Sequence, residues 1–265
     1  MIQYKTGNLT VFQSSLYKTN AAIVETNDAI IMTDPNWLPT EVDEIKDYLK
    51  LNFGNKPLYI IYTHSDFDHI IGAGAFPEAK GVATSQFVTN PEKEAILEKI
   101  IAFDQTYYLN RSYKPTYPTI DVVVTHNKQQ LRLGSQTVTF YHAPGHTGDS
   151  LFTVIEPEGI FLSGDYLSDV EFPFIFSSYQ DYLQTMVLAE TILNQHTIAI
   201  HVPGHGSVTR KKEELDKRLR SSNRYLAQLA KDDKEFEMTL RQEYLFFEGM
   251  KHIHAMNRQM AKKEE

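Results

Sequence analysis

The sequence predicts an α/β domain followed by a helical C-terminal extension, and three observations support this fold class. Short apolar segments typical of β-strands occur near both ends of the first 210 residues. Between them, segments with helical spacing of apolar residues alternate with strand-like ones, as in βαβ units. From about Arg210 onward the pattern is charged and helical. We therefore expect an α/β domain over residues 1–210 and a helical extension over 211–265, packed on the same domain.

The composition is that of a globular protein and argues against several classes. The 265 residues are 42% hydrophobic and 23% charged, which is enough for a sizeable buried core. No window approaches the roughly 18 uncharged apolar residues of a membrane span, and the N-terminus lacks a signal-peptide pattern. A net charge of −8 argues against a nucleic-acid partner. We therefore expect a cytoplasmic protein that acts on a small molecule.

Strand-like segments open the chain and lead to the first helix. They cover Leu9–Gln13, Ala21–Thr26 and Ala29–Thr33. A helix is expected from Thr40, which resembles the start of a capping box with Asp43.

The next strand is expected over Leu58–Tyr62, whose continuous apolar run is typical of a strand buried on both faces. It leads directly into His64. Residues 70–120 are interpreted as short helices, including one over Pro91–Phe103, and a loop rich in tyrosine and proline.

The second half of the domain again alternates strands with a helix. Strands are expected at Asp121–Thr125, Leu131–Leu133, Thr137–His142, Leu151–Ile155, Gly159–Ser163 and Thr197–Val202, and a helix over Gln180–Asn194. In the extension, Phe236, Leu240, Tyr244 and Phe247 form an apolar stripe. We expect this stripe to pack on the domain or on a second subunit, which would make a homodimer through the C-terminal helices.

The absence of cysteine restricts any metal site to histidine, carboxylate or carbonyl ligands. Four metal-capable side chains lie within His64–His69, which reads HSDFDH and follows the buried strand. Two carboxylates and two imidazoles are costly to bury together unless cations neutralise them. A solvated turn or a helix N-cap is the alternative interpretation of this segment.

Three further strand ends carry a ligand-type residue. Two of them have a Pro-Gly-His motif ending in His146 and His205, and the third has Gly164 followed by Asp165. One such motif is weak, because a histidine after a strand is often a surface turn residue. Four elements of this kind in one chain indicate a shared site.

In order and spacing, these motifs resemble those of the metallo-β-lactamase superfamily of metallohydrolases, over roughly residues 8–210. The resemblance implies a four-layer αββα sandwich, in which two mixed β-sheets face each other with helices outside and two metals lie along one sheet edge. The helical C-terminal extension would be added to this fold. Intervals of 77, 19 and 40 residues separate His69, His146, Asp165 and His205, and they suit the glyoxalase II and lactonase branch.

The resemblance also implies a role for each motif residue. His64, Asp66 and His146 would hold the first metal, Asp68, His69 and His205 the second, and Asp165 would bridge both. Outside these motifs, Asn20 and Asp34 match the N-terminal pattern of the family as supporting positions.

Asp66 departs from the HxHxDH motif of the family, because this chain has HxDxDH. Three carboxylates around two divalent cations leave a charge of about +1, and the harder oxygen ligands favour iron or manganese relative to zinc. The flavodiiron branch also has a carboxylate at this position. A decayed, mononuclear or inactive site is the alternative interpretation of Asp66.

The resemblance implies a dinuclear metallohydrolase with two divalent ions, zinc, iron or manganese, whose nucleophile is activated water. Asp68 or Asp165 would accept or relay the proton. A covalent route has no obvious nucleophile, since the chain lacks cysteine and a GxSxG serine. We expect an ester, lactone or thioester of a small molecule as substrate. The alternatives are a phosphodiesterase at the same metals, a di-iron redox protein and an inactive metal-binding sensor.

The remaining aromatic and histidine residues have two interpretations. Phe172, Phe174, Phe176 and Tyr179 would line an apolar cleft over the metals or pack in the core. Loop, packing or supporting positions are expected for the other six histidines, His126, His142, His196, His201, His252 and His254.

Overall fold

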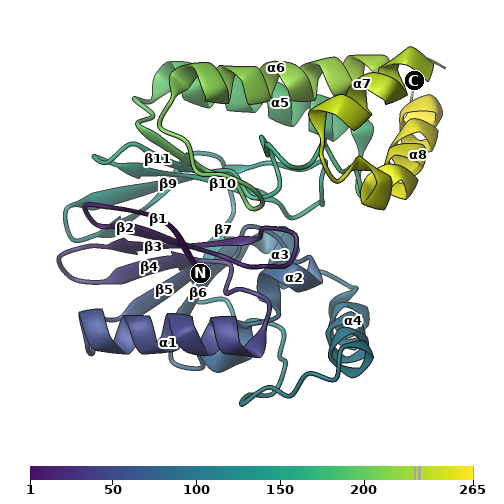
Figure 1. Cartoon of the computed structure of the whole chain (residues 1–265). Helices are drawn as coiled ribbons and strands as arrows, with labels where there is room; N and C mark the ends of the chain where they lie inside the picture. Colours follow the sequence, from purple (N-terminus) through teal and green to yellow (C-terminus); the bar gives the residue numbers. More distant parts are fainter. Residues whose placement is uncertain (230, 232–233, 265) are drawn as a thin grey trace.

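Two β-sheets face each other in the computed structural model, and helices cover both outer faces (Figure 1). The structure describes residues 1–229, 231 and 234–264. One sheet contains β1 to β7 in chain order, and the other has the order β12-β11-β10-β9-β8. Both sheets mix parallel and antiparallel pairs. This arrangement confirms the αββα sandwich.

The N-terminal half of the domain supplies the larger sheet. Its strands are β1 (Ile2–Thr6), β2 (Leu9–Gln13), β3 (Asn20–Glu25), β4 (Ile30–Thr33), β5 (Leu58–Ile61), β6 (Lys80–Thr84) and β7 (Val122–Val124). The helices of this half are α1 (Pro39–Phe53), α2 (Phe67–Ile70), η1 (Ala73–Ala75), α3 (Ser85–Val88) and α4 (Lys93–Thr106). From β4 to β7 neighbouring strands are parallel, so their carboxyl ends share one edge of the sheet.

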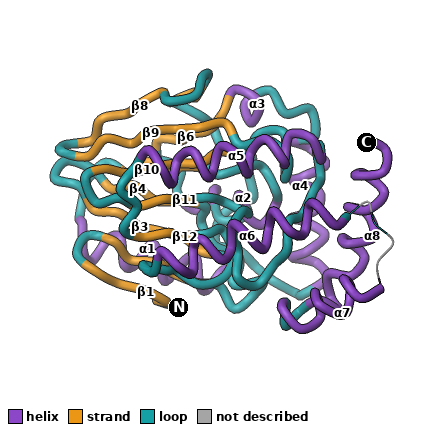
Figure 2. The backbone as a smooth tube through the Cα atoms, turned by 90° about the horizontal axis from the view of Figure 1, so that it is seen from above, coloured by secondary structure: helices purple, strands orange, loops and turns teal. Residues whose placement is uncertain are grey.

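The second half supplies the smaller sheet and most of the long helices. Its strands are β8 (Gln129–Leu133), β9 (Gln136–His142), β10 (Leu151–Glu156), β11 (Ile160–Leu162) and β12 (Ile200–Val202). Its helices are α5 (Tyr179–Gln195), α6 (Lys212–Gln228), α7 (Lys234–Glu243) and α8 (Phe247–Glu264). Figure 2 shows α5 and α6 side by side across the sheet, with α7 and α8 gathered at one end.

Three apolar clusters fill the spaces between the four layers and hold them together. The cluster between the two sheets contains residues of both, such as Val11 and Phe140, which are fully buried. A second cluster packs α1 and α4 against the larger sheet. The third joins the smaller sheet to α5, α6, α7 and α8, and it includes the stripe residues Phe236, Leu240, Tyr244 and Phe247. The C-terminal helices therefore pack on the domain, while the homodimer stays a prediction.

Two strands and one helix start differ from the sequence-based expectation. β1 was not expected, and β6 lies in a region interpreted as helical. β6 reads KGVAT, which is too rich in small residues to show a strand pattern, and it is stabilised by pairing with β5 and β7. α1 begins at Pro39 rather than at Thr40. The carboxylate that caps its N-terminus belongs to Glu41 rather than Asp43, and it accepts a hydrogen bond from Leu38 N at 3.1 Å.

No helix in the described part of the chain is long and apolar enough to cross a membrane.

Candidate metal centre

Loops at the ends of four strands bring the predicted ligands together. β5 ends at Ile61 and is followed by His64, and the short helix α2 then carries Asp68 and His69. His146, Asp165 and His205 follow β9, β11 and β12. The larger sheet thus supplies four of the seven side chains and the smaller sheet three, so the site lies at the seam between the sheets.

The first predicted ligand set, His64, Asp66 and His146, forms a close group. The Nε2 atoms of His64 and His146 lie 3.2 Å apart, and Asp66 Oδ2 lies 3.7 Å and 3.3 Å from them, respectively. The two imidazoles are buried, whereas the Asp66 side chain is 32% exposed. Asp66, which stands where the family motif has a histidine, therefore forms the solvent side of the set.

The second predicted set has nearly the same geometry. The Nε2 atoms of His69 and His205 lie 3.2 Å apart, and Asp68 Oδ2 lies 3.3 Å and 3.4 Å from them, respectively.

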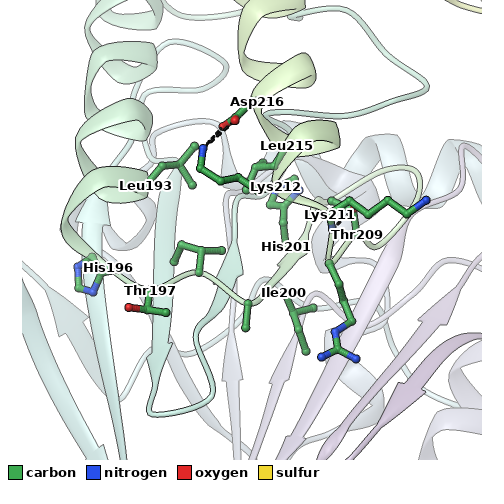
Figure 3. Close-up of a pocket in the computed structure, with 13 residues that line it drawn as sticks. Leu193, His196, Thr197, Ile200, His201, Thr209, Lys211, Lys212, Leu215 and Asp216 are labelled. Carbon is green, nitrogen blue, oxygen red and sulfur yellow. Dashed lines mark hydrogen bonds and ion pairs between the residues drawn. The ribbon is translucent and has the colours of Figure 1, made fainter.

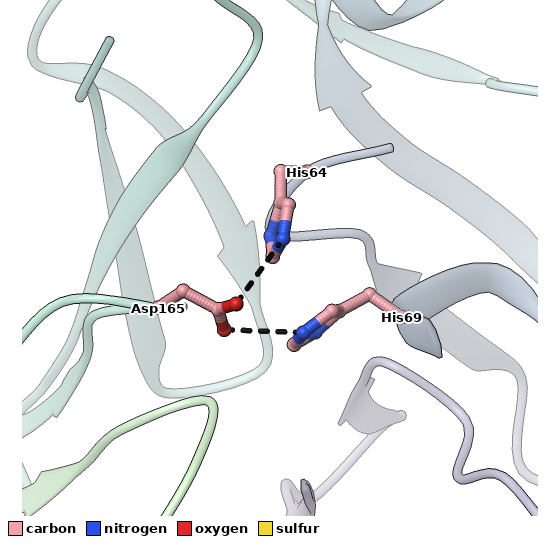
Figure 4. Close-up of side chains that lie close together, drawn as sticks. All are labelled: His64, His69 and Asp165. Carbon is pink, nitrogen blue, oxygen red and sulfur yellow. Dashed lines mark ion pairs between the residues drawn. The ribbon is translucent and has the colours of Figure 1, made fainter. Parts of the chain in front are cut away.

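Asp165 lies between the two sets. Figure 4 shows its two carboxylate oxygens facing His64 and His69, at 3.6 Å for Oδ2 and 3.1 Å for Oδ1. Oδ2 also lies 3.2 Å from Nε2 of both His146 and His205. The side chain is 7% exposed. Among the described residues, no donor hydrogen-bonds to the buried Oδ1 atom.

Hydrogen bonds at Nδ1 assign the tautomer of all four histidines. His146 and His205 donate from Nδ1 to the carbonyls of Phe174 and Tyr17, each at 2.9 Å. His69 donates from Nδ1 to Asp34 Oδ2 at 3.0 Å. Each of these rings, when neutral, therefore presents an unprotonated Nε2 to the centre.

His64 reaches the same state through a hydroxyl. Thr63 Oγ1 donates to Asp34 Oδ2 at 2.6 Å, so it accepts from Nδ1 of His64 at 3.0 Å. Nε2 lone pairs that face each other at 3.2 Å repel unless protons or cations lie between them. The donor set thus fits divalent metals, with histidines oriented by partners on their other nitrogen.

The electrostatics of the group support the same fit. Burial raises the pKa of Asp165, but the nearby imidazoles of His205, His69 and His64 hold it well below its usual range. Burial lowers the pKa of His146, but Asp165 and Asp66 raise it to about 10. Seven buried or half-buried ligand groups therefore attract positive charge at the centre, which two divalent cations would supply.

Glycines allow the close approach of the loops. A Cβ atom on Gly204 would overlap Asp165 Oδ1 and the main chain of Gly164. Gly145 has a φ of +126°, a conformation that favours glycine, and a Cβ there would overlap the backbone of Tyr182. In both Pro-Gly-His motifs, the residue before the histidine must therefore be glycine, because a side chain there would not fit.

The sequence matches the model of the metallo-β-lactamase superfamily over residues 15–226. The chain belongs to this superfamily. Its members are mostly hydrolytic metalloenzymes, and this membership agrees with the His/Asp groups in the structure. A search among curated proteins found no match.

Several solved structures share the fold at low sequence identity. A B3 metallo-β-lactamase described as having an active-site glutamic acid is 18% identical, with a TM-score of 0.59 over 84% of this chain and 87% of the other. A superfamily protein from Sulfolobus tokodaii is 14% identical, with a TM-score of 0.57 over 87% and 89%. An inverting sec-alkylsulfatase from Pseudomonas sp. is 12% identical, with a TM-score of 0.66 over 90% of this chain but 43% of the sulfatase. The glyoxalase II and lactonase branch stays a prediction.

A pocket of about 530 Å³ opens beside the first ligand set of this superfamily member. Asp66 and Phe176 are among its lining residues, and the centroid of the Phe176 ring lies 5.2 Å from that of His146. Polar residues line much of the rest, including Ser65, Asn90 and Thr147. Phe172 and Tyr179, by contrast, are buried in the core. Of the four aromatic residues considered for a cleft, only Phe176 lines this pocket.

A different pocket, of about 230 Å³, lies at the start of β12 and is lined by His196 and His201 (Figure 3). His201 is buried and contacts Ser163 Oγ through Nε2 at 2.9 Å, whereas His196 Nε2 contacts Tyr141 Oη at 2.7 Å. Lys212 and Asp216, which also line this pocket, form an ion pair. Neither histidine belongs to a group of possible metal ligands among the described residues.

Glu171 is a residue near the centre that the sequence pattern does not predict. Its Oε1 atom lies 3.9 Å from Nδ1 of His205, and its side chain is 10% exposed. Burial and the carboxylates of Asp165 and Asp68 raise its pKa to about 7, although His205 opposes this shift. The only available sign was an acidic residue six positions after Asp165, which is too common a feature to be predictive.

Proposed function

We propose that this superfamily member is a metal-dependent hydrolase that cleaves an ester, lactone or thioester of a small molecule at a dinuclear centre. The observation that carries the proposal is the position of Asp165 between two groups of three ligand-type side chains, each with its Nε2 lone pairs directed inward. Two bound divalent cations supply Lewis acidity towards water and a substrate oxygen.

The protein residues orient the reactants and move the proton. The ligands would be His64, Asp66 and His146 for one metal, Asp68, His69 and His205 for the other, and Asp165 for both. Asp68 and Asp165 are the proposed proton acceptors for the attacking water, because both are carboxylates that lie among the proposed metal ligands, where such a water would bind. The side chain of Asp68 is 14% exposed, which leaves it reachable from solvent.

The pocket beside Asp66 is the proposed binding site for the substrate. Ser65, Asn90 and Thr147 offer hydrogen bonds to a polar group, and Phe176 offers one apolar surface next to His146. A pocket of about 530 Å³ is in the range of small-molecule sites. This size supports a small molecule as the substrate.

The test combines metal analysis with a substrate panel. The purified protein is stripped with a chelator and reloaded separately with zinc, manganese or ferrous iron. Lactones, thioesters, carboxylic esters and phosphodiesters are then assayed with each form. We expect turnover of one of the first three classes that is lost on chelation and restored by metal. Turnover that survives both chelation and His146→Ala would contradict the proposal, and turnover of phosphodiesters alone would favour that alternative.

A di-iron redox function is the second candidate, because Asp66 adds a third carboxylate at the centre. Iron-loaded protein supplied with a chemical reductant and a mediator would then consume oxygen well above the rate of the zinc-loaded form. Equal oxygen consumption by the two forms would exclude this candidate.

A further inference from the structure

The main chain of residues 172–176 holds His146 in place. Phe174 O accepts the hydrogen bond from Nδ1 of His146 at 2.9 Å, and Phe176 N donates to the carbonyl of His146 at 2.8 Å. The segment belongs to no helix or strand, so no regular hydrogen-bond ladder fixes its path. Whatever orients the Phe174 carbonyl therefore sets the tautomer and direction of His146.

Asn257 of α8 binds the main chain on both sides of Phe174. Its Nδ2 donates to Pro173 O at 2.6 Å, and its Oδ1 accepts from Ile175 N at 3.0 Å. The Asn257 side chain is fully buried. Two opposed hydrogen bonds from one planar amide fix the orientation of the two peptide units that enclose Phe174.

A third hydrogen bond joins Asn257 to α6. Asn257 Nδ2 also donates to Tyr225 Oη at 3.0 Å, and this hydroxyl lies 3.0 Å from Nδ1 of His254. The ring of Tyr225 stacks on Phe172 with centroids 4.8 Å apart. The start of the segment is therefore packed against the same helices that bind its middle.

We propose that Asn257 is a positioning residue for the first metal site, acting through the Phe174 carbonyl on His146. The inference rests on the proposed role of His146 as a metal ligand. Asn257 lies beyond residue 226, where the superfamily match ends, so the C-terminal extension contributes a structural part of the centre that the family pattern does not include. The simpler role for such an asparagine is to satisfy buried backbone groups. A purely structural asparagine would affect only the stability of the fold, whereas a positioning residue would also affect the affinity for one metal.

The test measures metal binding and histidine tautomers in the full-length protein. Asn257→Ala removes all three bonds, those to Pro173 O, Ile175 N and Tyr225 Oη. Affinity for two equivalents of cobalt or zinc is measured by chelator competition. We expect Asn257→Ala to lower the affinity for one of the two ions by about tenfold or more, and the affinity for the other by less than threefold.

Met250→Ala is the matched control, because Met250 is a buried residue of α8 that packs in the same cluster. It should lower the melting temperature similarly without selective loss of one ion. Equal metal binding by Asn257→Ala and wild type, or the same selective loss in Met250→Ala, would overturn the proposal.

Nitrogen NMR of the histidine rings tests the inference without metal or substrate. Spectra of the metal-free protein are recorded above pH 10, because the pKa of His146 is raised to about 10 and only the neutral ring has a tautomer. In the wild type, we expect this neutral ring to carry its N–H at Nδ1. In Asn257→Ala we expect a mixture of tautomers at His146, while His69, bonded to Asp34, is unchanged. An unchanged His146 signal would overturn the proposal. This readout separates a failed positioning role from a failed hydrolase assignment, because it requires neither turnover nor a bound ion.

Discussion

Asp34 accepts a hydrogen bond from Nδ1 of His69 through Oδ2, at 3.0 Å. The same carboxylate also accepts from both the amide and the hydroxyl of Thr63. Since Thr63 Oγ1 accepts in turn from His64, one buried carboxylate orients a histidine of each ligand set. Asp34 thereby couples the two halves of the centre without touching either proposed metal position.

Asp34→Asn should therefore weaken metal binding without removing a ligand. The amide would place a donor where Oδ2 now accepts two bonds, favouring the wrong tautomer of His69. The positive φ of +30° at this position is compatible with asparagine. We expect a loss of about 10–100-fold in affinity, measured by chelator competition. Asp121→Asn is a matched control, since Asp121 also accepts a backbone bond, from Gly81 N, at 2.9 Å. An equal effect in both variants would argue against a specific role of Asp34.

Replacing proposed ligands should abolish hydrolysis and leave the fold intact. For Asp165→Asn and His146→Ala we expect kcat/KM to fall at least about a hundredfold. Because bound metal stabilises the native state, their melting temperatures should be compared with that of chelated wild type. His126→Ala, which changes an exposed histidine, is the control and should retain activity. Full activity in either ligand variant would contradict the assignment.

Restoring the family histidine should change the metal preference. Asp66→His replaces a carboxylate whose Oδ2 lies 3.3 Å from Nε2 of His146. Nitrogen ligation favours zinc over manganese and iron relative to oxygen ligation. Loading with equimolar zinc and manganese, followed by elemental analysis, should give a higher zinc fraction in Asp66→His than in wild type. An unchanged ratio would mean that Asp66 does not ligate.

Gly204→Ala should damage the centre more than an ordinary glycine substitution. The added Cβ would overlap Asp165 Oδ1 and the main chain of Gly164, so the loop after β12 must shift. We expect a loss of about 1–3 kcal/mol in the free energy of unfolding together with reduced metal content. Gly148→Ala, with no atom within 4 Å of the added Cβ, should show neither effect. Normal metal content in Gly204→Ala would show that the loop adapts.

His201 should make the protein less stable in acid. Burial, with the positive charge of Arg218, holds the pKa of His201 well below its usual range. The unfolded chain takes up this proton near pH 6.5. As the pH falls below about 6.5 the unfolded state binds more protons, and stability declines by up to about 1.4 kcal/mol per pH unit.

Urea unfolding of His201→Gln at pH 7.5, 6.5 and 5.5, with chelator present, isolates this contribution. Glutamine preserves a donor for Ser163 but does not titrate. The free energy of unfolding should therefore decline less in the variant than in wild type. Parallel curves would exclude His201 as the source. The exposed His126→Gln provides the control.

The sequence was sufficient to predict the αββα sandwich and the group of seven side chains, because the motifs follow apolar strands at intervals typical of the superfamily. β6 could not be predicted from its own residues, since KGVAT becomes a strand through its pairing with β5 and β7. The contributions of Glu171 and Asn257 depend on contacts across the fold. Asn257, for example, meets Pro173 and Ile175 only after α8 has docked, and no local pattern encodes such a contact.

The division of the ligands between two sheets has a consequence for the newly made chain. His64, Asp66, Asp68 and His69 leave the ribosome long before His146, Asp165 and His205 are translated. Until the later segments fold, the nascent chain contains only four of the seven proposed ligands, two imidazoles and two carboxylates. Such a partial set would bind metal weakly. The proposed centre can therefore be completed only after His205 has been translated and its loop has folded beside the earlier ligands.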